Sequence, residues 1–170
     1  MPTPQTPTVD TASAHKITPC LWFDRDAETA VAHYIAIFGD GRILNVSRYG
    51  DNMPLPKGTA LVVDFELAGQ RFQGLNGGPM YKFSEALSLS IRCDDQIQVD
   101  HFWTRLSEGG SEGRCGWLKD KFGLSWQVVP RQLGELMSSG APGSGGRVMQ
   151  ALMKMNKLDI AALERAHAGN

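Results

Sequence analysis

Two glutamines stand at matching places in a repeated pattern. Gly69-x-x-Phe72-Gln73 and Gly123-x-x-Trp126-Gln127 each carry a glycine, an aromatic residue and then an amide. A side-chain amide offers both donors and an acceptor, so such a pair could hold a small ligand by directed hydrogen bonds. The match itself indicates an internal repeat, in which the two glutamines occupy the same position.

Histidine is the commonest general base, which makes His33 and His101 candidates for catalysis. Each precedes an aromatic residue, in Val31-x-His33-Tyr34 and Val99-x-His101-Phe102. Both stretches have helical spacing, with the aromatic residue directed at a sheet. We therefore expect both histidines to lie on helix surfaces, remote from a binding face.

The three cysteines form an odd set without metal-type spacing, which suits a reducing compartment. Cys20 is expected to face a helix as a small buried hydrophobe. Cys115 stands beside Arg114 and near Lys119, where cations could activate a thiol. No base can be assigned to it from the sequence, so a nucleophilic role remains a weaker interpretation.

The elements that must position these residues follow one order twice. Alternation and helical periodicity predict a β-α-β-β-β unit and then a second, shorter unit. In the first we expect strands at 17–23, 43–49, 60–67 and 70–76, with a helix at 27–38. In the second we expect a strand at 87–93, a helix after Asp94 or Asp95, and a hairpin at 114–118 and 123–129.

The repeat is supported by residue matches in the expected order. His33 matches His101 at an offset of 68 positions, and Gly69 matches Gly123 at an offset of 54. The second offset is smaller by 68 − 54 = 14 positions, so the second copy has lost a strand and turn, or has shortened its loops. A duplicated unit explains both matches better than chance does.

The domain plan that follows is α+β. Residues 1–14 are rich in Pro and Thr and form a disordered leader. The paired βαβββ domain spans 15–135, with modules at about 15–80 and 84–132. Residues 136–170 are a flexible linker, with Ser138–Gly146 at its centre, and helical segments at 148–157 and 160–167.

Composition excludes several classes of function. The chain has 170 residues, 42% of them hydrophobic, with 17 basic and 18 acidic residues. Such a balance lacks the basic stripe of a nucleic-acid domain and the polybasic surface of a membrane-bound one. No apolar run approaches the roughly 18 residues of a membrane-spanning helix, and the N-terminus does not resemble a signal peptide. We expect a cytoplasmic protein without nucleic-acid or membrane partners.

The paired units resemble the vicinal-oxygen-chelate superfamily, which includes glyoxalase I and the bleomycin- and fosfomycin-resistance proteins. Within it, the chain is similar to the PhnB-like group, labelled 3-demethylubiquinone-9 3-methyltransferase. The resemblance covers about 17–169 and is carried by Leu21–Asp24, Ser47–Gly50, Leu75–Pro79, Cys115–Gln127, Arg147–Ala151 and Leu158–Glu164. It implies a half-barrel cleft formed by two modules, and chains that pair as homodimers. Tails that pack across the partner of such a dimer would cover the apolar stripe of Met149, Leu152, Met153, Met155 and Leu158.

The resemblance also implies where metal ligands would stand, on the first and last strands of each module. The last-strand positions fall on Gln73 and Gln127, and the first-strand positions fall on Pro19 and Leu87. Neither proline nor leucine binds a metal, and amide oxygens are weak partners for Zn²⁺ or Ni²⁺. We therefore expect no metal and no cofactor at this site.

The same alignment predicts the lining of the cleft, because side chains on a strand alternate between its faces. With Pro19 and Gln127 on the concave side, the lining is mostly apolar with a few polar groups. The predicted ligand-binding residues are Leu21, Phe23, Arg71, Gln73, Leu75, Leu89, Ile91, Ser125 and Gln127, with Leu87 and Val129 beside them. An equally open interpretation is that these side chains simply pack together.

Three functions remain open at this stage. The favoured one is a metal-free homodimer that binds a small aromatic or quinone-like molecule. The second is a metal-dependent lyase, isomerase or dioxygenase that uses other ligands, such as Asp64, Glu66 or His101. The third is methyl transfer, as the family label says, although Gly77-Gly78-Pro79 leaves no room for the helix that a glycine-rich cofactor turn requires.

Overall fold

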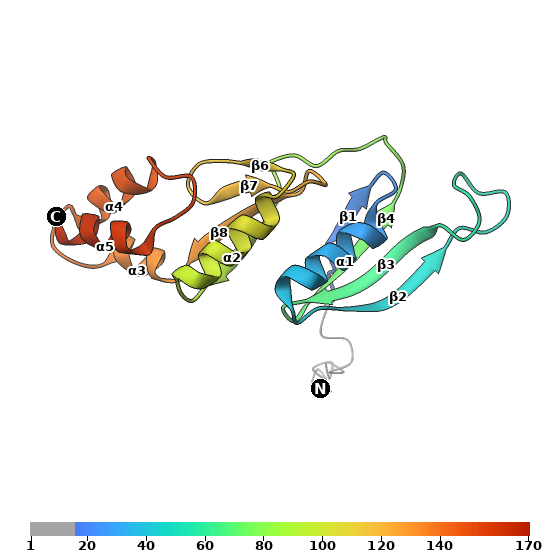
Figure 1. Ribbon diagram of the computed structural model, residues 1–170, viewed down its shortest axis with the longest axis horizontal. Coiled ribbons are helices and arrows are strands. Elements are labelled where there is room, and N and C mark those ends of the chain that lie inside the picture. The colour runs from blue at the N-terminus through green and yellow to red at the C-terminus, as the bar shows by residue number, and fades with distance from the viewer. Residues whose placement is uncertain (1–15) are drawn as a thin grey trace, which may run out of the picture. The chain divides into compact units, whose positions relative to one another are not determined.

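The described part of the chain divides into two compact units, one that ends at Met80 and one that comprises Tyr81–Asn170. A computed structural model describes residues 16–170, shown in Figure 1. Each unit contains a four-stranded mixed sheet and a helix in βαβββ order, and the second unit continues into C-terminal helices. The expected α+β class with two such modules is confirmed. The predicted leader, residues 1–14, lies outside the described residues.

The elements of the first unit are β1 (Cys20–Phe23), α1 (Ala27–Phe38), β2 (Arg42–Arg48), β3 (Ala60–Leu67) and β4 (Gln70–Asn76). The strands pair in the order β1-β4-β3-β2, with β1 parallel to β4 and the other pairs antiparallel. Helix α1 packs along one face of this sheet (Figure 1). We call the face without the helix the open face.

Packing between α1 and the sheet follows from alternation along the strands. Val63 and Phe65 on β3 are buried, while the residue between them is only half-buried. Gly74 on β4 lets the helix come close, because a Cβ there would already touch Ala27 at 3.4 Å and Val31 at 3.5 Å. Larger side chains at this position would separate the helix from the sheet.

Asn76, at the end of β4, fixes the start of α1. Its Oδ1 accepts the backbone N–H of Ala27 at 2.9 Å, and its Nδ2 donates to the carbonyl of Ala60 at 2.9 Å. The side chain is 1% exposed. A buried amide with both ends satisfied thus caps the helix from another strand, since Asp26 makes no side-chain cap of its own.

The second unit repeats the topology with shorter strands. Its elements are β5 (Ser88–Cys93), α2 (Gln96–Ser107), β6 (Ser111–Glu112), β7 (Trp117–Lys119) and β8 (Ser125–Pro130). They pair in the order β5-β8-β7-β6, with β5 parallel to β8. No strand of the repeat is lost. The second copy is shorter because β6 and β7 have two and three residues, and because the loop between them is short.

The C-terminal helices differ from the predicted linker and tail. They are α3 (Gln132–Ser138), α4 (Ser144–Leu152) and α5 (Ile160–Ala168). Helix α4 begins inside the stretch that was expected to be flexible. Ser144 Oγ donates to the carbonyl of Ser139 at 2.8 Å, and a Cβ on Gly145 would lie 2.4 Å from the carbonyl oxygen of Met137. The glycine therefore serves close packing between helices instead of flexibility.

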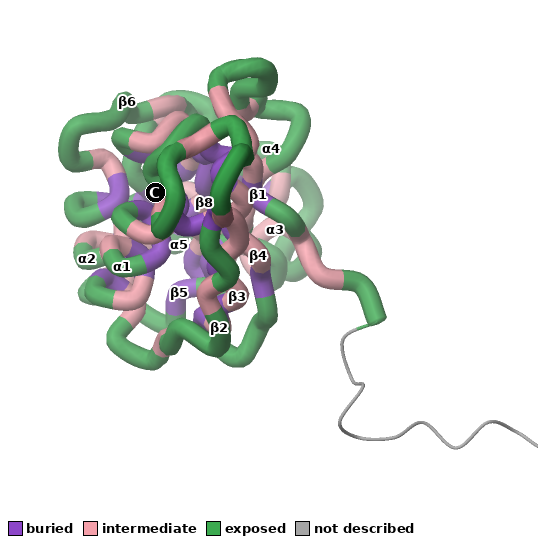
Figure 2. Tube along the Cα trace, turned by 90° about the vertical axis from the view of Figure 1, so that its right-hand side faces the viewer, coloured by how far each residue is buried: buried purple, intermediate pink, exposed green. Residues whose placement is uncertain are grey.

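Burial follows the same alternation in both units. Figure 2 shows the buried residues in purple, on strands and helices, with the connecting loops mostly exposed. The cores are built from large side chains such as Phe65 and Tyr34 in the first unit and Trp126 and Leu106 in the second. None of the described helices has the length and hydrophobicity needed to cross a membrane.

Candidate functional site

The open face of the first sheet is formed by Cys20 and Trp22 on β1 and by Gln73 and Leu75 on β4. Cys20 pairs in register with Gln73, and Trp22 pairs with Leu75. The predicted site residues Leu21 and Phe23 instead point to the helix side, where they are 1% and 4% exposed.

This placement corrects the expected lining of β1 by one residue. The strand begins at Cys20, so the position beside Gln73 is Cys20 and not Pro19. Successive side chains of a strand point to opposite faces, so a register shift of one residue moves every predicted side chain of β1 to the other face. Arg71, Gln73 and Leu75 do share the open face, as predicted, since they pair with Glu66, Asp64 and Val62.

The second sheet shows the same shift on its first strand. Ser88 and Ser90 pair in register with Ser125 and Gln127 on the open face. The predicted residues Leu89 and Ile91 pair with Trp126 and Val128, which are buried on the helix side. Ser125, Gln127 and Val129 lie on the open face, as the sequence predicted. Whether any of these side chains contacts a ligand stays a prediction.

The amide of Gln73 is oriented by a carboxylate. Its Nε2 donates to Oδ1 of Asp64 at 2.8 Å, and Asn45 Nδ2 donates to the other oxygen at 3.3 Å. An ionised carboxylate only accepts hydrogen bonds, so the nitrogen of Gln73 must face it. The carbonyl oxygen of Gln73 is thereby directed away from Asp64.

The amide of Gln127 has a different neighbourhood. Its Nε2 lies 2.9 Å from Ser88 Oγ, to which it donates. Directly across the strand pair stands Trp117, whose Cα is the register partner of Gln127. Cross-strand partners on one face have Cβ atoms within about 5.5 Å, so the indole and the amide are neighbours. An aromatic surface and a carbonyl acceptor thus lie side by side.

The donors at the implied metal positions do not match a divalent metal. With the register corrected, the first unit offers the Cys20 thiol and the Gln73 amide, and the second offers the Ser88 hydroxyl and the Gln127 amide. Partial desolvation raises the pKa of the Cys20 thiol, which disfavours the thiolate that a metal requires. Zinc-type sites use several imidazole, thiolate or carboxylate ligands.

The other ligands considered from the sequence do not gather either. Asp64 binds two amides, and Glu66 pairs with Arg42 at 2.9 Å. His101 is exposed on α2 in the other unit, as expected for a helix-surface residue, and His33 lies on α1. Within residues 16–170 no group of three or more His, Cys, Asp or Glu side chains is placed to hold a metal ion.

The cysteines are placed differently from one another. Cys20 is exposed, contrary to the expectation of a buried residue facing the helix, because it lies on the open face. Cys93 is fully buried on the helix side of β5. The Cys115 Sγ approaches the carbonyl of Leu152 at 3.6 Å and Met153 Sδ at 3.8 Å. The partners of Cys115 are therefore tail residues, and neither of them is a base.

A small cavity of about 200 Å³ opens at one corner of the second sheet. We call it the corner pocket and define it by Glu85, Ser111, Glu112, Trp117, Lys119 and Ser125. Lys119 Nζ forms an ion pair with Glu85. The hydrogen bond in this ion pair lowers the pKa of the Glu85 carboxyl. The pocket thus joins an aromatic ring, a neutralised cation and Ser125 on the open face.

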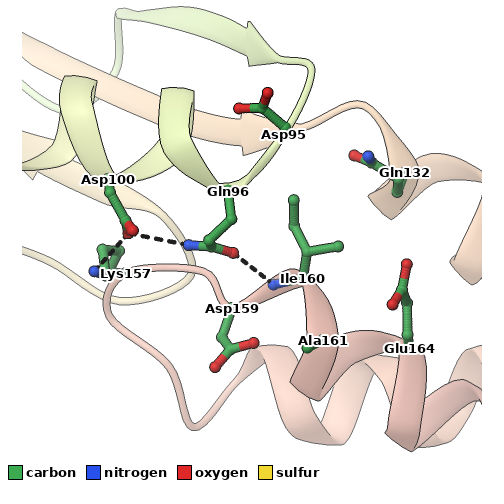
Figure 3. A pocket seen from close by; sticks show the side chains of 9 residues that line it. All are labelled: Asp95, Gln96, Asp100, Gln132, Lys157, Asp159, Ile160, Ala161 and Glu164. Carbon is green, nitrogen blue, oxygen red and sulfur yellow. Dashed lines mark hydrogen bonds and ion pairs between the residues drawn. The ribbon is translucent and has the colours of Figure 1, made fainter.

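A larger cavity of about 470 Å³ lies between α2 and the C-terminal helices (Figure 3). Three of its four carboxylates have structural partners: Asp95 and Asp159 cap α2 and α5, and Asp100 pairs with Lys157 at 2.6 Å. Gln96 donates to the carbonyl of Leu158 at 3.0 Å and accepts the N–H of Ile160 at 2.9 Å. This cavity marks where the tail docks on the module.

Sequence reasoning missed the two tryptophans of the open faces and the Lys119–Glu85 pair. Trp22 and Trp117 are half-buried, and Trp22 Nε1 donates to the carbonyl of Gly78 at 2.9 Å. A signal was present, because Leu21 and Phe23 alternate with Trp22 and are the more apolar set. The more apolar set of a strand faces its helix, which assigns Trp22 to the open face.

Comparison with known proteins gives a consistent result. The family model described as 3-demethylubiquinone-9 3-methyltransferase matches residues 15–129. Among solved structures, a PhnB protein from Bacillus cereus, provisionally described as such a methyltransferase, is 31% identical, with 68% of this chain and 98% of that chain covered and a TM-score of 0.63. Among curated proteins, none matches.

More distant structures share the fold alone. A Pseudomonas aeruginosa protein is 21% identical with a TM-score of 0.56, over 67% of this chain and 96% of that one. The fosfomycin resistance protein FosX from Listeria monocytogenes is 17% identical with a TM-score of 0.53, over 72% and 96%. The family match ends within β8, so helices α3 to α5 lie outside it.

Proposed function

Because the chain belongs to the 3-demethylubiquinone-9 3-methyltransferase family of PhnB-like proteins, we propose a function within the fold that it shares with them. The chain binds a small aromatic or quinone-like molecule on the open faces of its sheets, without a divalent metal at Gln73 and Gln127. On this proposal it sequesters or senses its ligand and transfers no methyl group.

The observation that carries the proposal is the pairing of Trp117 with Gln127. An indole ring provides a flat apolar surface, and aromatic pairs gain about 0.5–1.5 kcal/mol beyond the area that they bury. With Nε2 of Gln127 occupied by Ser88, the carbonyl oxygen is the end available to a ligand. This arrangement suits a flat ring that carries a hydrogen-bond donor, such as a hydroxyl.

The first unit has a similar combination on its own open face. Trp22 stands on β1, and Gln73, with its carbonyl directed away from Asp64, stands on the adjacent β4. The two tryptophans come from different strands of their modules, so this similarity is not inherited from the repeat. It supports a preference for aromatic ligands in both units.

Methyl transfer finds no support in the local structure. A cofactor turn of the doubly wound type needs a strand, a glycine-rich turn and a helix whose N-terminus binds the anionic part. Here β4 is followed by Gly77, Gly78 and an irregular segment that leads to β5. The Gly77 position is also covered by Trp22, whose ring a Cβ there would meet at 2.2 Å.

The test is a binding titration followed by tryptophan fluorescence and calorimetry. Hydroquinones and substituted phenols are the better probes, because the exposed Cys20 thiol would add covalently to a quinone. The wild-type chain is expected to bind at least one class of these compounds with quenching of its fluorescence. Gln127→Leu is expected to weaken this binding about fivefold to tenfold, while Gln150→Leu, an exposed change on α4, leaves it unchanged.

Three results would contradict the proposal. One equivalent of a transition metal in the purified protein, retained on dialysis and lost with an activity on chelation, would show a metal-dependent enzyme. Calorimetric binding of S-adenosylmethionine would favour methyl transfer. Failure of all aromatic probes to bind would remove the ligand class.

Homodimer formation and a cytoplasmic location stay predictions, and sedimentation equilibrium tests the first.

A further inference from the structure

The corner pocket contains a buried hydroxyl that lacks a partner. Ser125 is 1% exposed although it lies on the open face, and its Oγ makes no hydrogen bond to any described residue. Most buried polar groups in proteins are satisfied, because leaving one unpaired costs about 1–3 kcal/mol. An unpaired hydroxyl that lines a cavity is therefore a place where a ligand, or a water molecule, gains a hydrogen bond.

The charged groups of the corner pocket are already engaged. Glu112 Oε1 accepts the indole N–H of Trp103 at 2.9 Å, and Lys119 is paired with Glu85. With two carboxylates and one ammonium group, the pocket has a formal charge of −1. An anionic ligand would be repelled by this charge, because the ammonium group of Lys119 is already paired with Glu85. Because each carboxylate already accepts from a protein donor, the lining favours a neutral ligand over a cation as well.

Size and surface define that ligand further. The cavity volume is about 200 Å³. A dry protein cavity of about 150 Å³ holds one benzene ring, so this pocket has room for one substituted ring and not for two. Trp117 supplies an aromatic face, and Ser125 supplies a group that can both donate and accept.

We propose that the corner pocket binds a neutral single-ring phenol, with the ring against Trp117 and the hydroxyl hydrogen-bonded to Ser125 Oγ. This inference rests on the proposed function, which it deepens by naming the ligand class and the residue that selects it. Ser125 acts as a specificity-determining residue, because an analogue without a hydroxyl leaves its Oγ unpaired.

The experiment compares phenol, toluene and benzoate by NMR titration of the wild-type chain, read at the tryptophan indole N–H signals. Toluene matches phenol in size but lacks the hydroxyl, and benzoate adds a negative charge. Phenol is expected to bind about tenfold more tightly than toluene, and benzoate is expected to bind more weakly than phenol. This comparison needs no variant and does not depend on how a mutant folds.

Ser125→Ala then tests the residue itself. Removal of an unpaired buried hydroxyl is expected to raise the melting temperature of the ligand-free protein by a few degrees. The same change is expected to abolish the preference for phenol over toluene while toluene binds as before. Ser90→Ala, on the same face but exposed and outside the pocket, is expected to change neither quantity.

The outcomes separate this inference from the proposed function. Equal binding of phenol and toluene to the wild-type chain, or equal losses for both in Ser125→Ala, would overturn the role of Ser125. The proposed function survives either result if Gln127→Leu still weakens the binding of larger aromatic probes. If no aromatic compound binds at all, both fail together. A wild-type preference for benzoate would overturn the neutral-ligand assignment alone.

Discussion

Nε2 of Gln73 lies 2.8 Å from Oδ1 of Asp64, so a carboxylate determines which end of this amide faces outward. The partner of Gln127 is instead the hydroxyl of Ser88. Two residues that match in the repeat therefore sit in different electrostatic surroundings. Substituting glutamate at each position should therefore change the free energy of unfolding, and its pH dependence, to different extents.

Gln73→Glu is expected to destabilise the protein by about 1–3 kcal/mol at pH 7, because the donor to Asp64 is lost and two carboxylates repel each other. Repulsion raises the pKa of one of them above its unfolded value. Such a group favours the folded state at low pH, so stability should recover as the pH falls below about 5. Urea unfolding between pH 4 and 8 measures this.

Gln127→Glu is the matched control, because Ser88 Oγ can donate to the new carboxylate. It should show a smaller loss at pH 7 and little recovery in acid. Similar pH profiles for the two variants would contradict the assigned hydrogen bonds.

The repeat could be predicted from the matched residues of its two copies, and the last-strand faces from the glycine-aromatic-glutamine pattern that Gln73 and Gln127 share with the family's ligand positions. Gln73, Ser125 and Gln127 were therefore placed on the correct face. Strands β1 and β5 were shifted by one residue, because their faces were inferred from a count back from the helix and not from their own apolar pattern. That single shift exchanged Leu21 and Phe23 for Cys20 and Trp22.

Other features left no local signal. Strand β6 has two exposed residues, Ser111 and Glu112, and no apolar pattern to reveal it. The Lys119–Glu85 ion pair joins residues far apart in the sequence, so only the folded chain brings them together. The pairing of Trp117 with Gln127 depends on the strand register, which a short turn sets.

Asp120→Ala is expected to destabilise the protein by about 3 kcal/mol or more. Asp120 is 3% exposed; its Oδ1 accepts the N–H groups of Phe122 and Leu124, and its Oδ2 accepts the indole N–H of Trp126 at 2.8 Å. Alanine would leave these buried donors unsatisfied. Asp120→Asn should lose less, because its amide oxygen can still bind the backbone. Chemical unfolding measures both, and equal losses would contradict separate roles for the two oxygens.

Asp100 should contribute a small pH-dependent stability. Hydrogen bonds from Lys157 and then from Gln96 lower the pKa of this carboxyl below its usual value. The stabilisation by Asp100 is therefore fully present when the pH is above the pKa that its carboxyl has in the unfolded chain. It is lost as the pH falls through the lower pKa of the folded protein. The pair is about half exposed, so we expect less than about 1 kcal/mol. Asp100→Asn should be less stable than wild type at pH 7 and equal to it near pH 2.

Cys93 should resist thiol reagents that modify Cys20. Burial, with the nearby charges of Asp94 and Asp95, raises the pKa of Cys93 to about 11. The native protein should therefore be labelled faster at the exposed Cys20 than at Cys93, until denaturant exposes the Cys93 thiol. The pKa of Cys93 is higher in the folded state than in the unfolded state, so the free energy of unfolding should fall as the pH rises from about 9 to 11. Cys93→Ala should remove this pH dependence. Rapid native labelling of Cys93 would contradict its placement.

Gln96→Ala is expected to loosen the C-terminal tail while the module stays folded. The amide of Gln96 bridges the carbonyl of Leu158 and the N–H of Ile160, at the point where the tail turns into α5 (Figure 3). Loss of this bridge should speed hydrogen exchange of the Ile160 amide about fivefold, since one such bond contributes roughly 1 kcal/mol. Gln98→Ala is the control, because Gln98 bonds to the backbone of Asp94 and not to the tail. If both variants exchange alike at Ile160, the tail is held by its apolar contacts, such as the buried Leu158, and not by Gln96.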